Sequence, residues 1–329
     1  MDGNEHSRFL RDPHHDAETI DMILTFLGTG GAWGVPELNC DCVICRNMRQ
    51  RGERRRRTAL LLSGPSNLLI DCGPDIASQL SDHRIPRVDA LLITHEHGDH
   101  YLGLDELVSY KRSSPRGQFR PIPLYVTAKS WEVIGARFGY LEQMGVVEVH
   151  RVEPGRSYAV NDFDVVPFKT FHGPFASGSV GYLLSVQGRS GKSTRVVYTS
   201  DFVDLSDPPS ALFDPEYLII QSFWLNEPAK NTPHHMSFQR AVEFIRHMRP
   251  KEQTFLVHLG DGDQVAGDPA NSMAKKREPL NPLRPPHGTQ AYPVPRNQGE
   301  WQRLVDLVAA DFHLPCMCTV AYDGLTVPL

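Results

Sequence analysis

The chain has 329 residues, of which 40% are hydrophobic and 22% charged, and its formal net charge is −5. This composition is typical of a globular protein with a sizeable core and excludes a largely disordered chain. The acidic balance disfavours extended nucleic acid as a partner. No apolar run of about 18 residues predicts a membrane-spanning helix, and none predicts a signal peptide, so we expect a cytoplasmic protein without a membrane partner.

Short strands alternate with helices along the whole chain. A polar tail, residues 1–21, precedes a first strand at residues 23–27, and two strands around a Gly-Pro turn follow within residues 58–73. Helical spacing marks residues 74–82, 104–111 and 130–141, whereas residues 146–200 are rich in strands. A strand at 217–222, a helix at 237–248, a strand at 254–259, a helix at 301–312 and one closing strand at 318–327 complete the pattern. We predict an α/β protein with one domain over residues 22–329.

One segment departs from this pattern. Residues 262–299 are rich in Pro, Gly, Asn and charged residues and show no sustained apolar period. A long segment of this kind is a functional lid or a disordered insertion, and the sequence leaves both open.

The stretch THEHGDH, residues 94–100, concentrates three imidazoles and a carboxylate directly after the apolar run Ala90–Ile93. Imidazole nitrogens and carboxylate oxygens are ligands that Zn²⁺ accepts, and the same mixture suits Mn²⁺. A solvated histidine-rich loop is the alternative interpretation. Four such groups on one turn indicate more than one metal ion, with these candidate ligands: His95, His97, Asp99 and His100.

This His-x-His-x-Asp-His string resembles the signature of the metallo-β-lactamase superfamily. The resemblance implies an αββα sandwich, in which two mixed β-sheets are flanked by helices. It also implies three more metal ligands at strand ends, and the chain offers His172, Asp201 and His258. On this basis His95, His97 and His172 hold one divalent ion, Asp99, His100 and His258 hold the other, and Asp201 bridges them. Asp71 matches an aspartate that orients a ligand histidine.

The start of the chain resembles a narrower group, the phosphoribosyl cyclic phosphodiesterases of the PhnP type. The similar stretch is LGTGGAWGVPELNCDCVICRNMRQRGERRRRTALLL, residues 27–62. The resemblance implies that Cys40, Cys42 and Cys45 bind one structural Zn²⁺, which thiolates at this spacing suit. A disulfide framework is the less favoured interpretation in a chain without an export signal.

The fourth ligand of this cysteine site is open. The family has a histidine three residues after the last active-site histidine, where this chain has Asp261. A carboxylate can complete the site, or Asp261 can be a solvated acid. The remaining candidates are His287, His313, Cys316 and Cys318.

Two further stretches bear on catalysis. HHMSFQRAVEFI resembles a family segment whose histidine supplies a proton to the leaving oxygen, which implies this role for His235, with His234 as the alternative. Arg54–Arg57 form either a phosphate clamp or ordinary ion pairs, and we favour ion pairs. The glycines of GTGGAWG predict a tight turn near the metals, since the pattern of a phosphate loop is absent.

These features predict a metal-dependent phosphodiesterase that hydrolyses a small cyclic phosphodiester, either a ribosyl 1,2-cyclic phosphate or a nucleoside 2′,3′-cyclic phosphate. A hydroxide bridging two Zn²⁺ or Mn²⁺ ions, held in part by Asp99, would attack phosphorus, and His235 would protonate the departing oxygen. A ribonuclease Z-like nuclease and a non-catalytic, metal-stabilised PqqB-like protein are the alternatives. The sequence is compatible with a homodimer but does not fix the oligomeric state.

Overall fold

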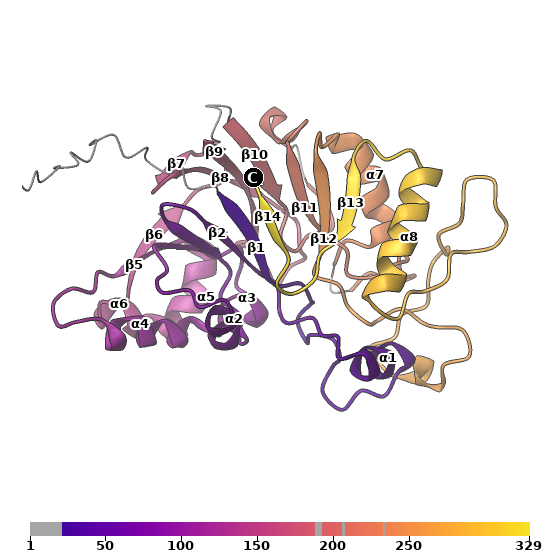
Figure 1. Ribbon diagram of the computed structural model, residues 1–329, viewed down its shortest axis with the longest axis horizontal. Coiled ribbons are helices and arrows are strands. Elements are labelled where there is room, and N and C mark those ends of the chain that lie inside the picture. Colours follow the sequence, from indigo (N-terminus) through magenta and orange to yellow (C-terminus); the bar gives the residue numbers. More distant parts are fainter. Residues whose placement is uncertain (1–21, 188–192, 206–207, 233) are drawn as a thin grey trace, which may run out of the picture.

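The computed structural model describes residues 22–187, 193–205, 208–232 and 234–329, so the polar tail predicted for residues 1–21 lies outside the described residues. Its strands form two seven-stranded sheets (Figure 1). In each sheet one half is antiparallel and the other half is parallel. The two mixed sheets with helices on their outer faces confirm the predicted αββα sandwich.

Each sheet combines strands from distant parts of the sequence. The first has the order β14-β1-β2-β3-β4-β5-β6, with β1 (Ile23–Gly28), β2 (Ala59–Ser63), β3 (Asn67–Ile70), β4 (Ala90–Leu92), β5 (Ile122–Thr127), β6 (Val147–Val152) and β14 (Thr326–Pro328). The second has the order β13-β12-β11-β10-β9-β8-β7, with β7 (Tyr158–Val160), β8 (Phe163–Lys169), β9 (Val180–Gln187), β10 (Ser193–Tyr198), β11 (Tyr217–Gln221), β12 (Gln253–Val257) and β13 (Met317–Val320).

Helices cover the outer faces of both sheets. Beside the first sheet lie α2 (Ile76–Asp82), α3 (Gly98–Tyr101), η1 (Leu104–Leu107), α4 (Val108–Ser113), α5 (Ala128–Phe138) and α6 (Tyr140–Gln143). Beside the second lie α7 (Phe238–Met248) and α8 (Gln298–Asp311) (Figure 1). The remaining helical segments are α1 (Val43–Arg51), η2 (Ser210–Leu212) and η3 (Pro269–Ser272).

The apolar side chains divide into three large clusters that match these layers. One cluster lies between the two sheets and includes Phe26 of β1 and Phe255 of β12, whose ring centroids are 5.0 Å apart. A second packs α7 and α8 on the second sheet, and a third packs α2 and α5 on the first sheet. Because each sheet is buried on both faces, its central strands are continuous apolar runs and not alternating ones.

Helix α7 shows how the sequence specifies an outer helix. Ser237 accepts a hydrogen bond from the backbone N–H of Arg240 and so caps the first turn. The buried residues Phe238, Val242 and Ile245 recur at helical spacing and face the second sheet. The helix ends at Arg249, which adopts a left-handed conformation with φ of 52°.

The single closing strand predicted for residues 318–327 is wrong. The chain forms β13, which pairs with β12 in the second sheet, and then β14, which pairs with β1 in the first sheet. Between them Tyr322–Leu325 form a turn, in which Gly324 has φ of 92°. The Asp-Gly pair at this turn is a signal for a break that the apolar pattern on both sides obscured.

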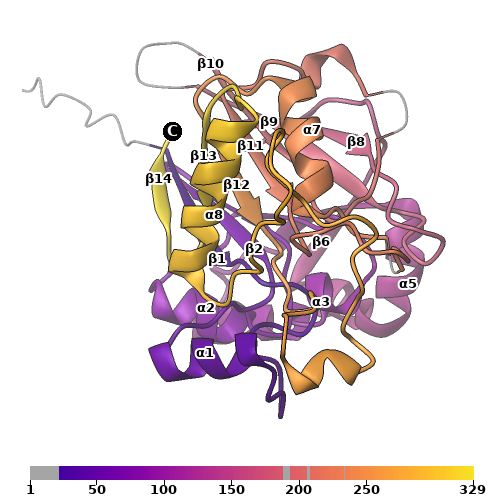
Figure 2. The ribbon, with the colours of Figure 1, turned by 90° about the vertical axis from the view of Figure 1, so that its right-hand side faces the viewer.

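The segment 262–299 is irregular except for η3 and the start of α8, yet it is packed against the rest of the protein. It lies beside α1 (Figure 2), where Asp268 accepts a hydrogen bond of 2.8 Å from the backbone N–H of Val43. Ala270 packs into a small apolar cluster with the α1 residues Ile44 and Met48. This packing against α1 favours a folded segment over a disordered insertion.

A buried lysine anchors this segment. Lys276 Nζ donates to the carbonyl oxygens of Asp261 and Asp263, at 2.6 and 2.9 Å. The Asp263 carboxylate in turn accepts hydrogen bonds from the backbone N–H groups of Leu225 and Asn226. Buried polar groups of this kind are costly when one partner is removed.

No helix in the described ranges is both long enough and apolar enough to cross a membrane.

We predict that Lys276→Met lowers the free energy of unfolding by about 2–3 kcal/mol, because two buried carbonyl oxygens lose their donor. Urea denaturation followed by circular dichroism measures this change. The control Lys129→Met alters an exposed lysine on α5 and should change stability by less than about 0.5 kcal/mol. Equal stability of both variants would contradict an anchoring role.

Candidate active site

The loops that carry the predicted site residues leave the two sheets at one edge. Strands β10, β11 and β12 are parallel, and β8 has the same direction because two antiparallel steps relate it to β10. Carboxyl ends of strands with the same direction meet at one edge of a sheet. One group of site residues follows a strand of the first sheet, and the others follow strands of the second sheet. In chain order they are His95–His100 after β4, His172 after β8, Asp201 after β10, His235 after β11 and His258 after β12.

A first group of possible metal-binding atoms comes from His95, His97 and His172. One nitrogen of each ring lies within 4.8 Å of the others. The Nε2 atom of His172 is 3.0 Å from Nδ1 of His97, and Nδ1 of His172 donates to the carbonyl oxygen of His234 at 2.9 Å. That hydrogen bond fixes the ring so that the Nε2 lone pair faces the group.

A second group is formed by Asp99, His100, Asp201 and His258, again within 4.8 Å of one another. His258 Nε2 lies 3.0 Å from an Asp201 oxygen, and His100 Nε2 lies 3.1 Å from an Asp99 oxygen. Asp201 is also 3.7 Å from His172 of the first group. It therefore lies between the two groups, where the sequence predicts a bridging carboxylate.

Several of these atoms are buried without a hydrogen-bond partner of acceptable geometry among the described residues. Such atoms are rare in native proteins because each costs desolvation energy. Their number and closeness fit divalent cations, which imidazole and carboxylate groups accept. The unpartnered atoms are Nε2 of His95, Nε2 of His100, Oδ1 of Asp201 and Nε2 of His258.

At Asp201, His172 and His95 the geometry favours the protonation states of metal ligands. His100 differs, because burial lowers its pKa but the carboxylates of Asp99 and Asp71 outweigh burial and raise that pKa well above its ordinary value. Burial would raise the pKa of the Asp201 carboxyl, but His258 and His100 beside it hold that pKa well below its ordinary value. Burial lowers the pKa of His172 to about 4 and lowers that of His95 well below its usual range. An ionised carboxylate and neutral imidazoles are the forms that bind metal.

Asp71 orients one of the candidate ligands. Its Oδ2 atom accepts from Nδ1 of His100 at 2.7 Å, and both its oxygens contact the hydroxyl of Thr94. The Asp71 side chain is fully buried. The contact leaves Nε2 of His100 directed at the second group, which agrees with the orienting role expected for this aspartate.

Backbone strain gathers at the same place. Asp71, Ser200 and His258 have φ of 65°, 54° and 59°, in the left-handed region that residues other than glycine rarely adopt. Each one lies at the end of a strand, where the sharp change of direction aims a side chain across the edge of the sheet. Strain of this kind persists where the surroundings fix it, and it is common at functional sites.

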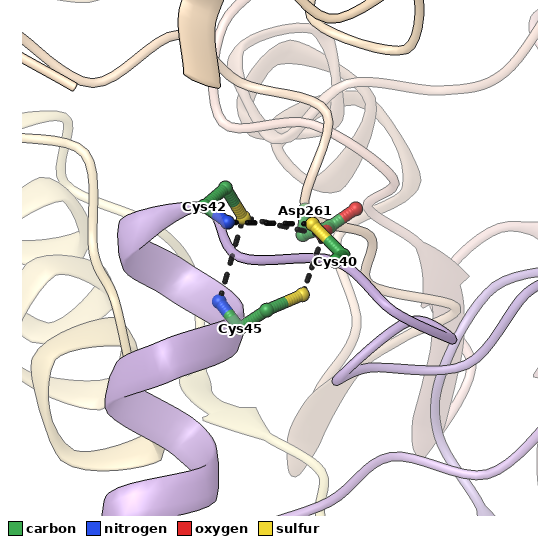
Figure 3. Close-up of side chains that lie close together, drawn as sticks. All are labelled: Cys40, Cys42, Cys45 and Asp261. Carbon is green, nitrogen blue, oxygen red and sulfur yellow. Dashed lines mark hydrogen bonds between the residues drawn. The ribbon is translucent and has the colours of Figure 1, made fainter. Parts of the chain in front are cut away.

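The three cysteines lie together with Asp261 (Figure 3). The Asp261 Oδ2 atom is 2.8 Å from the sulfur of Cys45, 3.5 Å from that of Cys42 and 3.8 Å from that of Cys40. The hydrogen bond from Cys45 is the main cause that lowers the pKa of the Cys42 thiol to about 6. Three thiols and one carboxylate have the donor chemistry of a structural zinc site.

The other candidates for the fourth position have different surroundings. Cys316 contacts the hydroxyl of Thr254 at 3.3 Å, and Cys318 lies beside it in β13. His287 and His313 line a separate surface pocket. Among the five candidates, only Asp261 belongs to a group of possible ligands with the cysteines in the described residues.

Lys275 was not anticipated from the sequence. Its Nζ atom donates to carboxylates of both Asp261 and Glu37. No motif marks this lysine, because it lies in the irregular segment and reaches the cysteines only through folding. It contacts the same Asp261 oxygen, Oδ2, as the sulfur of Cys45.

A cavity of about 480 Å³ lies between the histidine and aspartate groups at the sheet edge and the cysteine group with Asp261. Candidate ligands from the edge of the sheets and Asp261 of the cysteine group both contribute to its wall. The segment 262–299 supplies Gly262, Lys275 and Arg277 to the same wall. The lining also includes Trp33, Glu37, Arg57, His97, Asp99, Asp201, Phe223 and His235.

His235, and not His234, faces this cavity. Its Nδ1 atom lies 2.8 Å from the side-chain amide nitrogen of Gln221, whose oxygen accepts from the backbone N–H groups of Phe202 and Met236. Those two donors fix the orientation of the amide, so its NH₂ group donates to Nδ1. The proton of neutral His235 therefore resides on Nε2, which has no hydrogen-bond partner among the described residues.

No sequence pattern marks Gln221, because a glutamine at the end of an apolar strand is not distinctive. Burial also lowers the pKa of His235 well below its ordinary range. His235 is thus a neutral donor in this state.

The arginines before β2 form ion pairs, as the sequence favours. Arg56 contacts Asp82 at 2.8 Å and Asp323 at 3.3 Å, and Arg57 contacts Asp75 at 3.3 Å. Arg55 is buried and donates to the carbonyl oxygen of Ala321 at 2.6 Å. These contacts occupy the guanidinium groups in structural roles, although Arg57 also reaches the cavity wall.

A family model described as a beta-lactamase superfamily domain matches residues 66–259, more than half of the chain. The chain belongs to the metallo-β-lactamase superfamily. Members of this superfamily are mostly hydrolases, and the fold binds divalent metals.

Individual relatives are more distant. The chain is 28% identical over 247 residues to an octanoyltransferase of Porphyromonas gingivalis, covering 72% of this chain and 46% of the relative. It is 28% identical over 195 residues to a ribonuclease Z of Archaeoglobus fulgidus, covering 58% of this chain and 55% of the relative. The chain thus spans about half the length of these curated relatives.

A solved diphosphatase of the PhnP family shares the fold. It superposes with a TM-score of 0.67 at 24% identity, covering 94% of this chain and 98% of the other. This similarity covers most of the chain and supports the fold. The substrate has to be inferred from the residues of the site, because one fold can carry many functions.

We predict that the purified protein contains about three metal equivalents, since two groups of ligands and one cysteine cluster converge. Cys45→Ser should reduce the content by about one equivalent and leave the other two in place. Elemental analysis after gel filtration measures this. Loss of all metal from a folded Cys45→Ser variant would contradict the independence of the cysteine site from the site formed by the histidine and aspartate ligands.

Proposed function

We propose that this protein is a metal-dependent phosphodiesterase that hydrolyses a small cyclic phosphodiester, such as a ribosyl 1,2-cyclic or nucleoside 2′,3′-cyclic phosphate. The observation that carries the proposal is the set of buried ligand atoms described above that have no hydrogen-bond partner among the described residues. One of them belongs to Asp201, which lines the same cavity as His97, Asp99 and His235. Cations held there would face a group that enters the cavity.

His95, His97 and His172 would hold one Zn²⁺ or Mn²⁺ ion. Asp99, His100 and His258 would hold the second, with Asp201 shared. A pair of divalent ions supplies a hydroxide at neutral pH and neutralises charge on the oxygens of a phosphoryl group.

The protein's own groups then act on the departing oxygen. His235 presents an Nε2–H donor to the cavity, since Gln221 occupies its Nδ1 atom. A neutral imidazole donates a hydrogen bond that stabilises the charge developing on the departing oxygen. Gln221 acts as a positioning residue, because it selects the tautomer without reaching the cavity.

The size and charge of the site favour a small substrate. The cavity of about 480 Å³ is in the range of sites for small molecules. Extended RNA requires a broad basic surface, whereas the chain has a net charge of −5 and its arginines before β2 are paired with carboxylates.

A ribonuclease Z-like activity is the second candidate, because curated relatives of that name match about half of the chain. A non-catalytic, PqqB-like role is the third. The two groups of possible ligands contain all seven of the predicted residues, which favours an enzyme over a scaffold.

The test is a hydrolysis assay on protein reconstituted with Zn²⁺ or Mn²⁺. Bis(p-nitrophenyl) phosphate, a ribose 1,2-cyclic phosphate, a nucleoside 2′,3′-cyclic phosphate and a precursor tRNA are compared at several salt concentrations. We expect turnover of the cyclic phosphates with weak salt dependence. Cleavage of the tRNA alone would support the nuclease, and inactivity on all substrates by metal-loaded protein would refute the proposed function.

Replacing His235 tests its role. We predict that His235→Ala lowers kcat by roughly 10²- to 10⁴-fold, because the departing oxygen loses its donor, while the metal content stays unchanged. The control His247→Asn alters an exposed histidine on α7 and should keep wild-type kcat. Wild-type turnover by His235→Ala would remove this residue from the mechanism.

A further inference from the structure

Trp33 is the exposed tryptophan of this protein. Its side chain is 69% exposed, whereas Trp131, Trp224 and Trp301 are 8%, 2% and 5% exposed. Tryptophan carries a large apolar surface that proteins normally bury. An exposed tryptophan that also lines a cavity can contact a molecule that enters that cavity.

The exposure does not come from a loose backbone. The Gly34 N–H donates to the Gly31 carbonyl oxygen at 2.9 Å, closing the predicted turn. The Ala32 carbonyl oxygen accepts from Arg57 Nε at 3.0 Å, and Val35 and Arg55 exchange two backbone hydrogen bonds, of 2.9 and 2.6 Å. Trp33 is thus held on a fixed turn, which lowers the entropy that a contact with its ring would cost.

This turn lies at the same edge of the sandwich as the metal ligands. The turn follows β1. Strands β1 and β3 both pair antiparallel with β2, so they run in the same direction, and β4, which precedes His95, is parallel to β3. Trp33 accordingly lines the same cavity as Asp201 and His235. One small molecule can therefore touch both the candidate metal centre and the tryptophan.

Trp33 presents an aromatic face that no ring of residues 22–187, 193–205, 208–232 or 234–329 covers. Phe223, another aromatic side chain of the cavity wall, is stacked on His235 with ring centroids 4.2 Å apart and 15° between the planes. No ring pair involves Trp33 among the described residues. Arg277 adds hydrogen-bond donors to the same wall and forms no ion pair with the described residues.

We infer that Trp33 is a platform on which the substrate's nucleobase stacks, so that the protein selects nucleoside cyclic phosphates over cyclic sugar phosphates without a base. This inference rests on the proposed function and narrows its substrate class. A nucleobase combines a flat face for the tryptophan with a polar edge for donors such as Arg277, while its phosphodiester reaches the metal ligands. A ribose alone leaves the indole in solvent.

The first test compares two substrates, adenosine 2′,3′-cyclic phosphate and ribose 1,2-cyclic phosphate. Stacking on an aromatic side chain predicts that Trp33→Ala raises KM for the adenosine compound by roughly 5- to 150-fold and changes KM for the ribose compound by less than about 2-fold. Trp33→Phe should restore most of the affinity. Equal effects of Trp33→Ala on both substrates would overturn the inference.

A matched control removes an exposed aromatic side chain that does not line the cavity. Phe175 is 84% exposed and lies outside the cavity wall. Phe175→Ala should leave KM for both substrates at the wild-type value. A selective loss of the adenosine substrate in this variant would also count against a platform at Trp33.

The second test measures binding without turnover. Because the other three tryptophans are buried, iodide should quench mainly the emission of Trp33. Adenosine 2′-monophosphate should protect this emission and ribose 5-phosphate should not, and the quenchable component should vanish in Trp33→Phe. Absence of protection by the nucleotide would overturn the inference. Protection without hydrolysis of any phosphodiester would support the platform and refute the proposed function.

Discussion

The fold depends on one electrostatic problem, the burial of several imidazoles and two carboxylates at a single edge of the sandwich. His95, His100 and His258 are buried, and each has a nitrogen without a hydrogen-bond partner of acceptable geometry among the described residues. Removing such groups from water is unfavourable unless charge of the opposite sign compensates. Among common ligands, divalent cations compensate both an anionic carboxylate and a neutral imidazole lone pair. The ends of strands with the same direction bring these groups together at that edge.

Neighbouring side-chain and backbone groups orient the histidines of this site. Asp71 fixes the ring of His100, and the carbonyl oxygen of His234 fixes the ring of His172, so contacts within the protein orient both candidate ligands. Gln221 has an analogous relation to His235, although that histidine faces the cavity as a donor. The site is therefore preorganised by contacts that reach it from both sheets. Preorganised dipoles and donors are the main source of stabilisation of charge in a reacting group.

The sequence predicts those parts of the site that are local or ordered along the chain. His95, His97, Asp99 and His100 share one turn, so their spacing alone brings them together. The strand ends that carry His172, Asp201 and His258 follow from the superfamily's order of elements, and the structure places all three side chains at the same edge.

The remaining features depend on packing that no pattern records. Gln221 contacts His235 only because β11 ends beside the loop before α7, and Lys275 reaches Asp261 only because the irregular segment folds back. The exposure of Trp33 is likewise a property of the turn and not of the residue type. The division of residues 318–327 between two sheets was marked by Asp-Gly, but strong apolar residues on both sides concealed it.

The pairing of β1 with β14 has a consequence for biosynthesis. The register joins Ile23 to Pro328, across almost the whole described chain. Before β14 has been synthesised, β1 has an outer side with unpaired backbone groups, and such an edge can pair with other chains. Closure of the first sheet is thus a long-range event, and the nascent protein depends on β14 to remove a surface prone to aggregation.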